Sequence, residues 1–560
     1  MSVHLHTILF DRGHNRVLHF LRRGAGTVSL IALALVMVLL PLQLLGQALV
    51  AVLALLLFIT APWSIWLVIG LLLPITSSIV LGPLHLTDLL LLAAVALWFA
   101  EGVRYRALRL QSTWLLVPIA LYGFILYLAL LQATSFVEAA TELLKWVLFA
   151  VILVILPPMV QRKGATGMRC HWLVIGLLLG GVVQAAIGIY QFIFRIGPEW
   201  FVIMGRFMRA SGTFNQPNPY AGYLGLTLPI AVSLTFWAFQ EFWQQRSSVR
   251  TTDISQASLG TAASMPDPAL AHRGATPNGL LPVATRTDRT GSIWLHAAIL
   301  LFYTVATALI GAALIASWSR GGWLGALGST LVVVLLRSRR TLILGIAAAL
   351  LVTLALLLGF LQPNMIPQPI AARFQDIPAY LGMSDLLNQP LTDENFAIVE
   401  RLAHWDAALR MWERAPWLGV GPGNYAVIYP EVRLPRWEEA LGHAHNIYLN
   451  TLAESGIGGL IAYLILWITL FAWLGNAYRR SARTENPQER WRASLLIGVI
   501  GMLCHLSIHN FFDNLFVQGN YLHIALWVAI IVSMTPRNGS VAVDSQTADS
   551  PGMSSRCYTG

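Results

Sequence analysis

The chain has 560 residues, of which 56% are hydrophobic and only 11% are charged. Soluble domains carry about 25% charged residues, so this composition excludes a soluble globular protein. The net charge of +10 is interpreted as membrane topology and not as nucleic-acid binding. The three cysteines (Cys170, Cys504 and Cys557) are far apart and match no metal or disulfide framework.

In chain order, residues 1–26 form a retained basic cytoplasmic segment, because no short apolar run with a small-residue cleavage site follows the N-terminus. Apolar stretches of membrane-spanning length then predict an all-α integral membrane bundle of about 12 to 14 helices. The candidate spans are 27–42, 45–60, 63–78, 86–101, 113–132, 137–157, 172–196, 219–240, 293–317, 320–337, 341–361, 457–476, 492–511 and 519–535.

Arginine-rich linkers between spans fix the expected orientation. The tight linkers "RSRR" (337–340) and "YRRSAR" (478–483) belong on the cytoplasmic side by the positive-inside rule. This orientation puts both chain ends in the cytoplasm and the long segment 362–456 outside the cytoplasmic (inner) membrane. No glycine loop followed by Lys-Ser/Thr occurs, so no nucleotide-hydrolysing motor is encoded.

Two long segments interrupt the spans. Residues 241–292 are rich in Ala, Ser, Thr, Gly and Pro and predict a disordered cytoplasmic loop. Residues 362–456 are sequence-complex and predict a partly helical lid. The expected regions are an N-terminal transmembrane region (27–240), central transmembrane helices (293–361), C-terminal transmembrane helices (457–535) and a disordered cytoplasmic tail (536–560).

Three motifs converge on the predicted outer face. In "RASGTFNQPNPYAGYLGL" (209–226), Asn218 caps a helix near Arg209; in "SWSRGGWLGAL" (317–327), Arg320 begins a glycine-rich span. In "GHAHNIYLNTLAESGIGG" (442–459), Asn446 caps a helix that carries His445 at its outer end. Helix N-termini and arginines on one face predict an anion site suited to a phosphate or pyrophosphate.

Less specific explanations exist for each feature. Interfacial arginines often snorkel to headgroups, and a lone interfacial histidine is more often structural than catalytic. His505, His509 and Asp513 are spaced as one helical stripe that could bind zinc, but polar residues facing a bundle interior explain the stripe equally well. The span 137–157 carries Glu138, Glu142 and Lys145 on one helical side, and we interpret them as a buried structural ion pair with a neighbouring acid.

These motifs, together with "RLAHWDAALRMWERAPWLGVGPGNY" (401–425), resemble the O-antigen ligase family of bacterial membrane glycosyltransferases, which includes the O-antigen polymerases. The similarity covers roughly residues 200–475. It implies a GT-C-like fold, a glycan donor carried on undecaprenyl pyrophosphate, and a lipid or glycan acceptor. It also implies His445 as the catalytic histidine and Arg209 and Arg320 as pyrophosphate ligands. His443, Glu454 and Arg401 are weaker candidates for substrate binding, beside Asn218 and Asn446.

The chemistry of the residues agrees with a metal-independent transfer that needs no cofactor. Guanidinium groups can stabilise a pyrophosphate leaving group, and a histidine can accept the proton of an acceptor hydroxyl. The alternatives that remain are a polymerase of the same family, a transporter or flippase, and a membrane scaffold. The polar residues cluster at one face and show no internal repeat, which favours the enzyme. The sugar, the acceptor and the oligomeric state are not predicted.

Overall fold

The computed structural model describes residues 42–262, 286–338 and 395–535 apart from short gaps, with parts of 340–354. Its contacts divide the chain into two units, Met1–Ile65 with Leu92–Leu108, and Trp66–Leu91 with Arg109–Gly560. In the first unit lie helix α2 (Leu42–Thr60) and most of α4 (Leu86–Arg104). Both helices expose large apolar side chains such as Leu53 and Phe99, as helices that face lipid do.

The second unit is a helical bundle that holds the candidate site. Its helices form where apolar stretches can satisfy their own backbone hydrogen bonds, which lipid requires. They are α3 (Ser64–Thr76), α5 (Leu116–Ala129), α6 (Phe136–Val160), α7 (Thr166–Phe194), α8 (Pro217–Ala262), α9 (Arg286–Ala316), α10 (Arg320–Arg337), α14 (Phe396–Arg414), α15 (Tyr425–Val432), α16 (Ile447–Ser481), α17 (Pro487–His509) and α18 (Asn520–Ser533).

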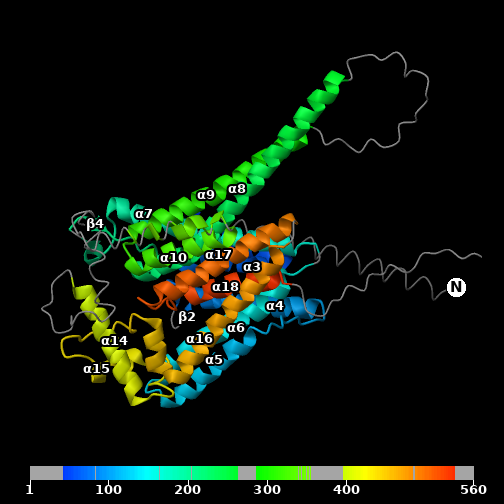
Figure 1. Ribbon diagram of the computed structural model, residues 1–560. Helices are drawn as coiled ribbons and strands as arrows, with labels where there is room; N and C mark the ends of the chain where they lie inside the picture. Colours follow the sequence, from blue (N-terminus) through cyan, green and yellow to red (C-terminus); the bar gives the residue numbers. More distant parts are fainter. Residues whose placement is uncertain are drawn as a thin grey trace, which may run out of the picture. The chain divides into compact units, whose positions relative to one another are not determined.

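Strands are confined to two short antiparallel pairs in the described residues. Strand β1 (Val80–Leu81) pairs with β2 (Leu84–His85), and β3 (Val202–Ile203) pairs with β4 (Phe207–Met208). Within the bundle, α8 packs along α9 and α17, α10 packs on α17, and α16 packs on α5 and α14 (Figure 1). The protein is therefore all-α, as predicted.

Seven described helices are long and apolar enough to cross a membrane. These are α4, α6, α7, α16, α17, the Pro217–Ser247 part of α8 and the Ile293–Ala316 part of α9; shorter apolar helices are α3, α18 and α5 continued by η1 (Leu130–Gln132). The protein is a polytopic membrane protein. The predicted spans 27–42 and 341–361 lie largely outside the described residues, so the count of 12 to 14 stays a prediction.

The segment 241–292, predicted as a disordered loop, is helical at both ends. Helix α8 continues to Ala262, and α9 begins at Arg286; residues 263–285 lie outside the described part. Composition indicated disorder because the segment has little apolar surface to bury. A polar segment that continues an existing membrane helix needs no new nucleation, and nucleation is the costly step of helix formation.

Part of the predicted lid, 395–446, folds against the bundle as α14 and α15 with their connecting turns. Helix α16 begins at Ile447, before the predicted boundary at residue 456. That boundary coincides instead with a kink, since Gly456 has φ 66° and ψ −170° inside the helix. Residues 355–394 lie outside the described residues.

The kink at Gly456 ties the lid to the bundle. It frees carbonyl groups of α16 from their own helix, and the turn before α15 supplies their donors. Val420 N–H donates to the Ala453 carbonyl at 2.9 Å, and Gly421 N–H donates to the Glu454 carbonyl at 3.0 Å. A side chain at position 456 would collide with the Trp417 carbonyl. This conformation is open only to glycine.

Replacing Gly456 by alanine should therefore destabilise the protein by about 1–3 kcal/mol from backbone strain alone. Gly475→Ala is the matched control, because it lies on the same helix and its added Cβ meets nothing within 4 Å. The control should be neutral or stabilising by up to about 1 kcal/mol. Thermal unfolding in detergent measures both variants; equal midpoints for the two would contradict the role of the kink.

Candidate active site

The N-terminus of α16 carries the central histidine. Asn446 caps this helix as predicted: its Oδ1 accepts hydrogen bonds from Tyr448 N–H at 3.0 Å and Leu449 N–H at 3.1 Å. The preceding residue, His445, has φ 51°, in the left-handed region that non-glycine residues rarely adopt. Strained backbone of this kind is frequent where a side chain must be aimed at a functional position.

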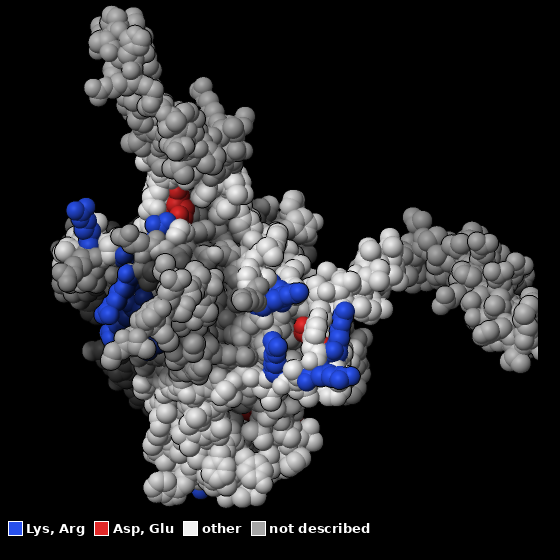
Figure 2. All heavy atoms as spheres, turned by 90° about the vertical axis from the view of Figure 1, so that its right-hand side faces the viewer, with Lys and Arg blue, Asp and Glu red and all other residues white. Residues whose placement is uncertain are grey.

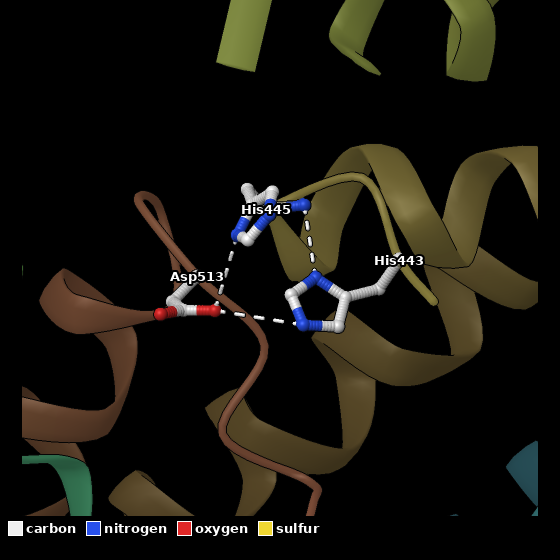
Figure 3. Close-up of side chains that lie close together, drawn as sticks. All are labelled: His443, His445 and Asp513. Atoms are coloured by element: carbon white, nitrogen blue, oxygen red, sulfur yellow. Dashed lines mark hydrogen bonds and ion pairs between the residues drawn. The ribbon is translucent and has the colours of Figure 1, made fainter. Parts of the chain in front are cut away.

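One carboxylate oxygen of Asp513 faces two histidines (Figure 3). Its Oδ1 is 3.5 Å from His445 Nδ1 and 3.7 Å from His443 Nε2. His443 Nδ1 accepts a hydrogen bond from the His445 backbone N–H at 3.1 Å. The carboxylate therefore comes from the turn between α17 and α18, and both imidazoles come from the segment that opens α16.

These contacts favour one tautomer of each ring. Because His443 Nδ1 is an acceptor, the proton of its neutral ring sits on Nε2, which faces Asp513. A proton on His445 Nδ1 faces the same carboxylate, so His445 Nε2 keeps its lone pair. Both ring nitrogens of His445 are buried; Nδ1 has only the long contact to Asp513 Oδ1 at 3.5 Å, and Nε2 has no hydrogen-bond partner in the described part of the chain. His445 Nε2 is thus the ring nitrogen of the group that faces no polar partner among the described residues.

The electrostatics of the group favour a charged Asp513 and a neutral His443. Burial would raise the pKa of the Asp513 carboxyl, but the hydrogen bond and charge of His445, with His443 and His509, hold it below its usual value. Burial, with the nearby His445, lowers the pKa of His443 to about 3. Asp513 is therefore ionised and His443 is neutral at neutral pH.

On the lid side, His404 of α14 packs against His445, and Tyr425 of α15 holds His404. The His404 ring lies edge-on to the His445 ring, with centroids 5.8 Å apart. His404 Nδ1 donates to the Tyr425 hydroxyl at 3.0 Å, and that hydroxyl donates in turn to the His404 carbonyl. Burial, then His445, lowers the pKa of His404 to about 4. The pKa of Glu400 is raised by burial, against the attraction of His445 and Arg401.

Arg209 lies between the N-termini of α8 and α10, the helices that begin in the first two sequence motifs. Arg209 Nε donates to the Ser317 carbonyl at 3.0 Å, and its Nη2 donates to Asn218 Oδ1 at 3.0 Å. This guanidinium therefore joins the start of α8 to the turn before α10 in a fixed orientation. Asn218 is not the helix cap that the sequence predicted, because α8 already begins at Pro217; its side chain orients Arg209 instead.

Arg320 is the first residue of α10, where the Ser319 hydroxyl caps the helix by accepting from Gly322 N–H. A Cβ at Gly321 would meet the His509 ring and Phe512 at the end of α17. The glycines of this motif thus allow α17 to pack closely against α10. Arg401 and Asp513 both interact electrostatically with His509. The Arg320 start of α10 and Arg401, in the second turn of α14, therefore approach the turn that supplies Asp513.

The other predicted residues have different roles. The Glu454 Oε1 accepts a hydrogen bond from Tyr425 N–H at 3.1 Å, and the side chain lines a cavity that His443 also lines. The three residues considered as a zinc-binding stripe do not lie on one helix, because α17 ends at His509 and Asp513 follows in the next turn. His505 Nε2 contacts His509 Nδ1 at 3.3 Å, whereas Asp513 turns towards His443 and His445.

His443, His445 and Asp513 also form a group that could hold a metal ion, since one ligand atom of each lies within 4.8 Å of the others. Nitrogen and carboxylate ligands of this kind suit zinc. The sequence predicted no metal, and it considered zinc only for the α17 stripe. The same three residues thus allow two chemistries, a histidine base held by a carboxylate or a bound cation, which a chelator distinguishes.

Sequence reasoning missed the partnership of Asp513 with the histidines of α16, and it missed His404 altogether. Asp513 was singled out only for its spacing from His505 and His509, which describes one helix and not contacts between helices. A signal for His404 exists in the quoted 401–425 motif, where it follows Arg401 by three residues and so lies on the same helical side.

Residues 305–464 match the family model described as O-antigen ligase. No curated protein matches the chain. The matched segment includes Arg320, Arg401, His443 and His445, whereas Arg209 and Asp513 lie outside it. Together with the polytopic helical fold, the match supports the assignment of the chain to the O-antigen ligase and polymerase family, as the motifs predicted. This family implies a membrane glycosyltransferase that acts on lipid-linked glycans.

The buried neutral histidines predict loss of stability in acid. The pKa values of His404 and His443 are lowered in the folded protein to about 4 and 3, from about 6.5 when unfolded. Protonation of these two groups leaves the free energy of unfolding unchanged above pH 6.5. That free energy decreases as pH falls below 6.5, because the unfolded chain binds the protons first. Each histidine lowers the free energy of unfolding by about 1.4 kcal/mol per pH unit below 6.5, until its folded pKa is reached.

Thermal unfolding in detergent between pH 7.5 and 4.5 tests this dependence. The midpoint should fall steadily below pH 6.5, and His404→Gln should reduce the slope relative to the wild type. A midpoint that is flat from pH 7 to 5 would contradict the assigned neutral state of these rings.

Proposed function

We propose that the protein transfers a glycan from undecaprenyl pyrophosphate to an acceptor hydroxyl. The observation that carries this proposal is the Asp513 carboxylate that faces both His443 and His445, on the turn after α17, against whose end the Arg320 start of α10 packs. The O-antigen ligase match supports a lipid-linked glycan as the donor. The reaction then needs a base for the hydroxyl and positive charge for the leaving pyrophosphate.

His445 is the proposed general base. Its Nε2 accepts the proton of the acceptor hydroxyl while the hydroxyl oxygen forms a bond to the anomeric carbon of the donor. Asp513 holds the tautomer and stabilises the imidazolium that forms, as a carboxylate does beside a catalytic histidine. The bond from the anomeric carbon to the pyrophosphate oxygen breaks, and undecaprenyl pyrophosphate leaves with the electron pair.

Arg209 and Arg320 are the proposed ligands of the pyrophosphate. The guanidinium of Arg209 is held by the Ser317 carbonyl and Asn218, so its orientation costs little when the anion binds. Arg320 begins α10, whose N-terminal N–H groups and dipole also attract negative charge. Arg401, on α14, adds a third positive charge near His509. No metal is needed for charge neutralisation in this proposal.

We further propose that the end of the bundle with α14 and α15 faces away from the cytoplasm, in the cytoplasmic (inner) membrane. Support comes from the arginines at the other helix ends, where Arg337 ends α10, Arg479 and Arg480 end α16, and Arg490 lies near the start of α17. The face in Figure 2 carries several Lys and Arg side chains and few acidic ones. Positive charge of this kind is retained in the cytoplasm.

Transfer assays in proteoliposomes test the function, with an undecaprenyl-pyrophosphate-linked glycan and membrane extract from the source cells as the acceptor pool. His445→Ala should lower the rate by about 10²–10⁴ and Arg320→Ala by about 10²–10³. Arg479→Ala, an exposed arginine in the last turn of α16, is the matched control and should keep full activity.

The same assay with EDTA tests metal independence, and activity should be unchanged. Loss of activity that added Zn²⁺ restores would show that His443, His445 and Asp513 bind a metal, and the base assignment would be wrong. A wild type that consumes no donor with any acceptor fraction would remove the transferase proposal and favour a transport function.

Asp513→Asn tests the role of the carboxylate separately. The amide keeps the size of the side chain but cannot stabilise an imidazolium, so the rate should fall about a hundredfold or more. Asp406→Asn is the matched control, because the same change on α14 affects only a carboxylate paired with Arg410 at 2.8 Å. An Asp513→Asn variant with a wild-type rate constant would show that His445 needs no such partner.

A further inference from the structure

A separate cavity of about 190 Å³ opens beside the histidines, between α5, α6 and α16. One of its walls is formed by His443, whose ring centroid lies 4.5 Å from that of His445. Asn514 and Phe516, in the same turn as Asp513, form another wall. The cavity therefore ends at His443, whose ring packs against that of the proposed base, and none of the arginine-bearing helix starts of α8 and α10 lines it.

The polar wall of the cavity is an ion pair with acids beside it. Lys145 Nζ is 2.5 Å from Glu142 Oε2 and also donates to the Phe516 carbonyl at 3.2 Å. The side chains of Lys145 and Glu142 remain 22% and 24% exposed. Glu138 and Glu454 complete this wall. Three carboxyl groups thus accompany a single ammonium group that is already paired.

Aromatic rings form the rest of the lining. Trp146 is packed edge-on against Tyr122, with centroids 4.8 Å apart, and against Phe516 at 5.4 Å. Tyr463 lies 5.7 Å from Tyr122 and also faces the cavity. Ligand sites are typically apolar and aromatic with a few polar groups that fix orientation. Rings beside carboxylates suit a sugar, whose C–H faces pack on aromatics and whose hydroxyls donate to acids.

The charge of the lining selects among sugars. A phosphate-bearing sugar would have to approach the carboxylates of Glu138 and Glu142 with only Lys145 in compensation, and like charges at short range are costly. An uncharged sugar meets no such repulsion. The volume is below the 300–1,000 Å³ of pockets for drug-sized ligands, and it suits a single sugar ring more than a chain.

We propose that this cavity binds an uncharged sugar ring of the acceptor and presents its hydroxyl to His445. The assignment rests on the transferase function proposed above and adds the class of acceptor to it. In this arrangement the donor pyrophosphate is held by the starts of α8 and α10, the acceptor sugar lies between α5, α6 and α16, and the two meet at the turn that carries Asp513.

Direct binding tests the cavity without any turnover. The full-length protein in nanodiscs is titrated with a methyl hexopyranoside and with its 6-phosphate, and tryptophan fluorescence and calorimetry report binding. The neutral sugar should bind saturably, and the phosphate should bind at least about tenfold more weakly. Trp146→Phe should remove most of the fluorescence change if the sugar lies against that ring.

Glu142→Gln should weaken binding of the neutral sugar at least about tenfold, since a hydrogen bond to a charged group is lost. Glu241→Gln is the matched control: the same change at the other end of the bundle, where the carboxylate pairs with Arg490 at 3.0 Å. In the transfer assay, Glu142→Gln should raise the KM for acceptor by a similar factor and leave the KM for donor unchanged.

The outcomes separate this inference from the function on which it rests. The cavity assignment is wrong, and the transferase proposal stands, if the wild type transfers glycan and Glu142→Gln has the same KM for acceptor as the wild type. Equal binding of the sugar and its phosphate has the same meaning. Saturable, Glu142-dependent sugar binding without donor consumption keeps the cavity as a sugar site and overturns the transferase. Absence of sugar binding with active transfer also rejects the cavity.

Discussion

The contact of Asp513 with His443 and His445 is the interaction on which the site depends. It joins two segments that the chain separates by the whole length of α16 and α17. A backbone bond from Ile447 N–H to the Asn510 carbonyl at 2.9 Å fixes the same junction. A buried carboxylate is stable only when it is paired, so the two imidazoles and the acid need each other for burial as much as for chemistry.

The second constraint is that the lid is part of the bundle. Its turn donates to the carbonyls released by the kink at Gly456, and Asn424 bonds to the backbone of Ser135 in both directions, at 2.6 and 3.1 Å. The kink, the turn and the cavity wall are consequently one structure. Because Glu454 lies within it and accepts from Tyr425 N–H, its apparent place in the histidine motif reflects packing of this junction.

Much of the fold follows from local patterns in the sequence, and the site follows only in part. Apolar length predicted the membrane helices, and Asn446 was recognised as a cap because a cap depends on residues within one turn. The partner of His445 could not be recognised in this way, since Asp513 reaches it across a helix packing. Lys145 and Glu142 were correctly read as a pair from their spacing, but spacing does not show that a pair faces a cavity.

The order of the site along the chain has a consequence for its biosynthesis. Arg209, Arg320, Arg401 and His445 are all made before Asp513, which follows the next-to-last described helix, α17. A nascent chain that has inserted every earlier helix still lacks the carboxylate that orients both imidazoles. In the reaction proposed above, the base therefore gains its carboxylate partner only when α17 and the turn after it have docked on α16, so Asp513 is the last of this group to arrive.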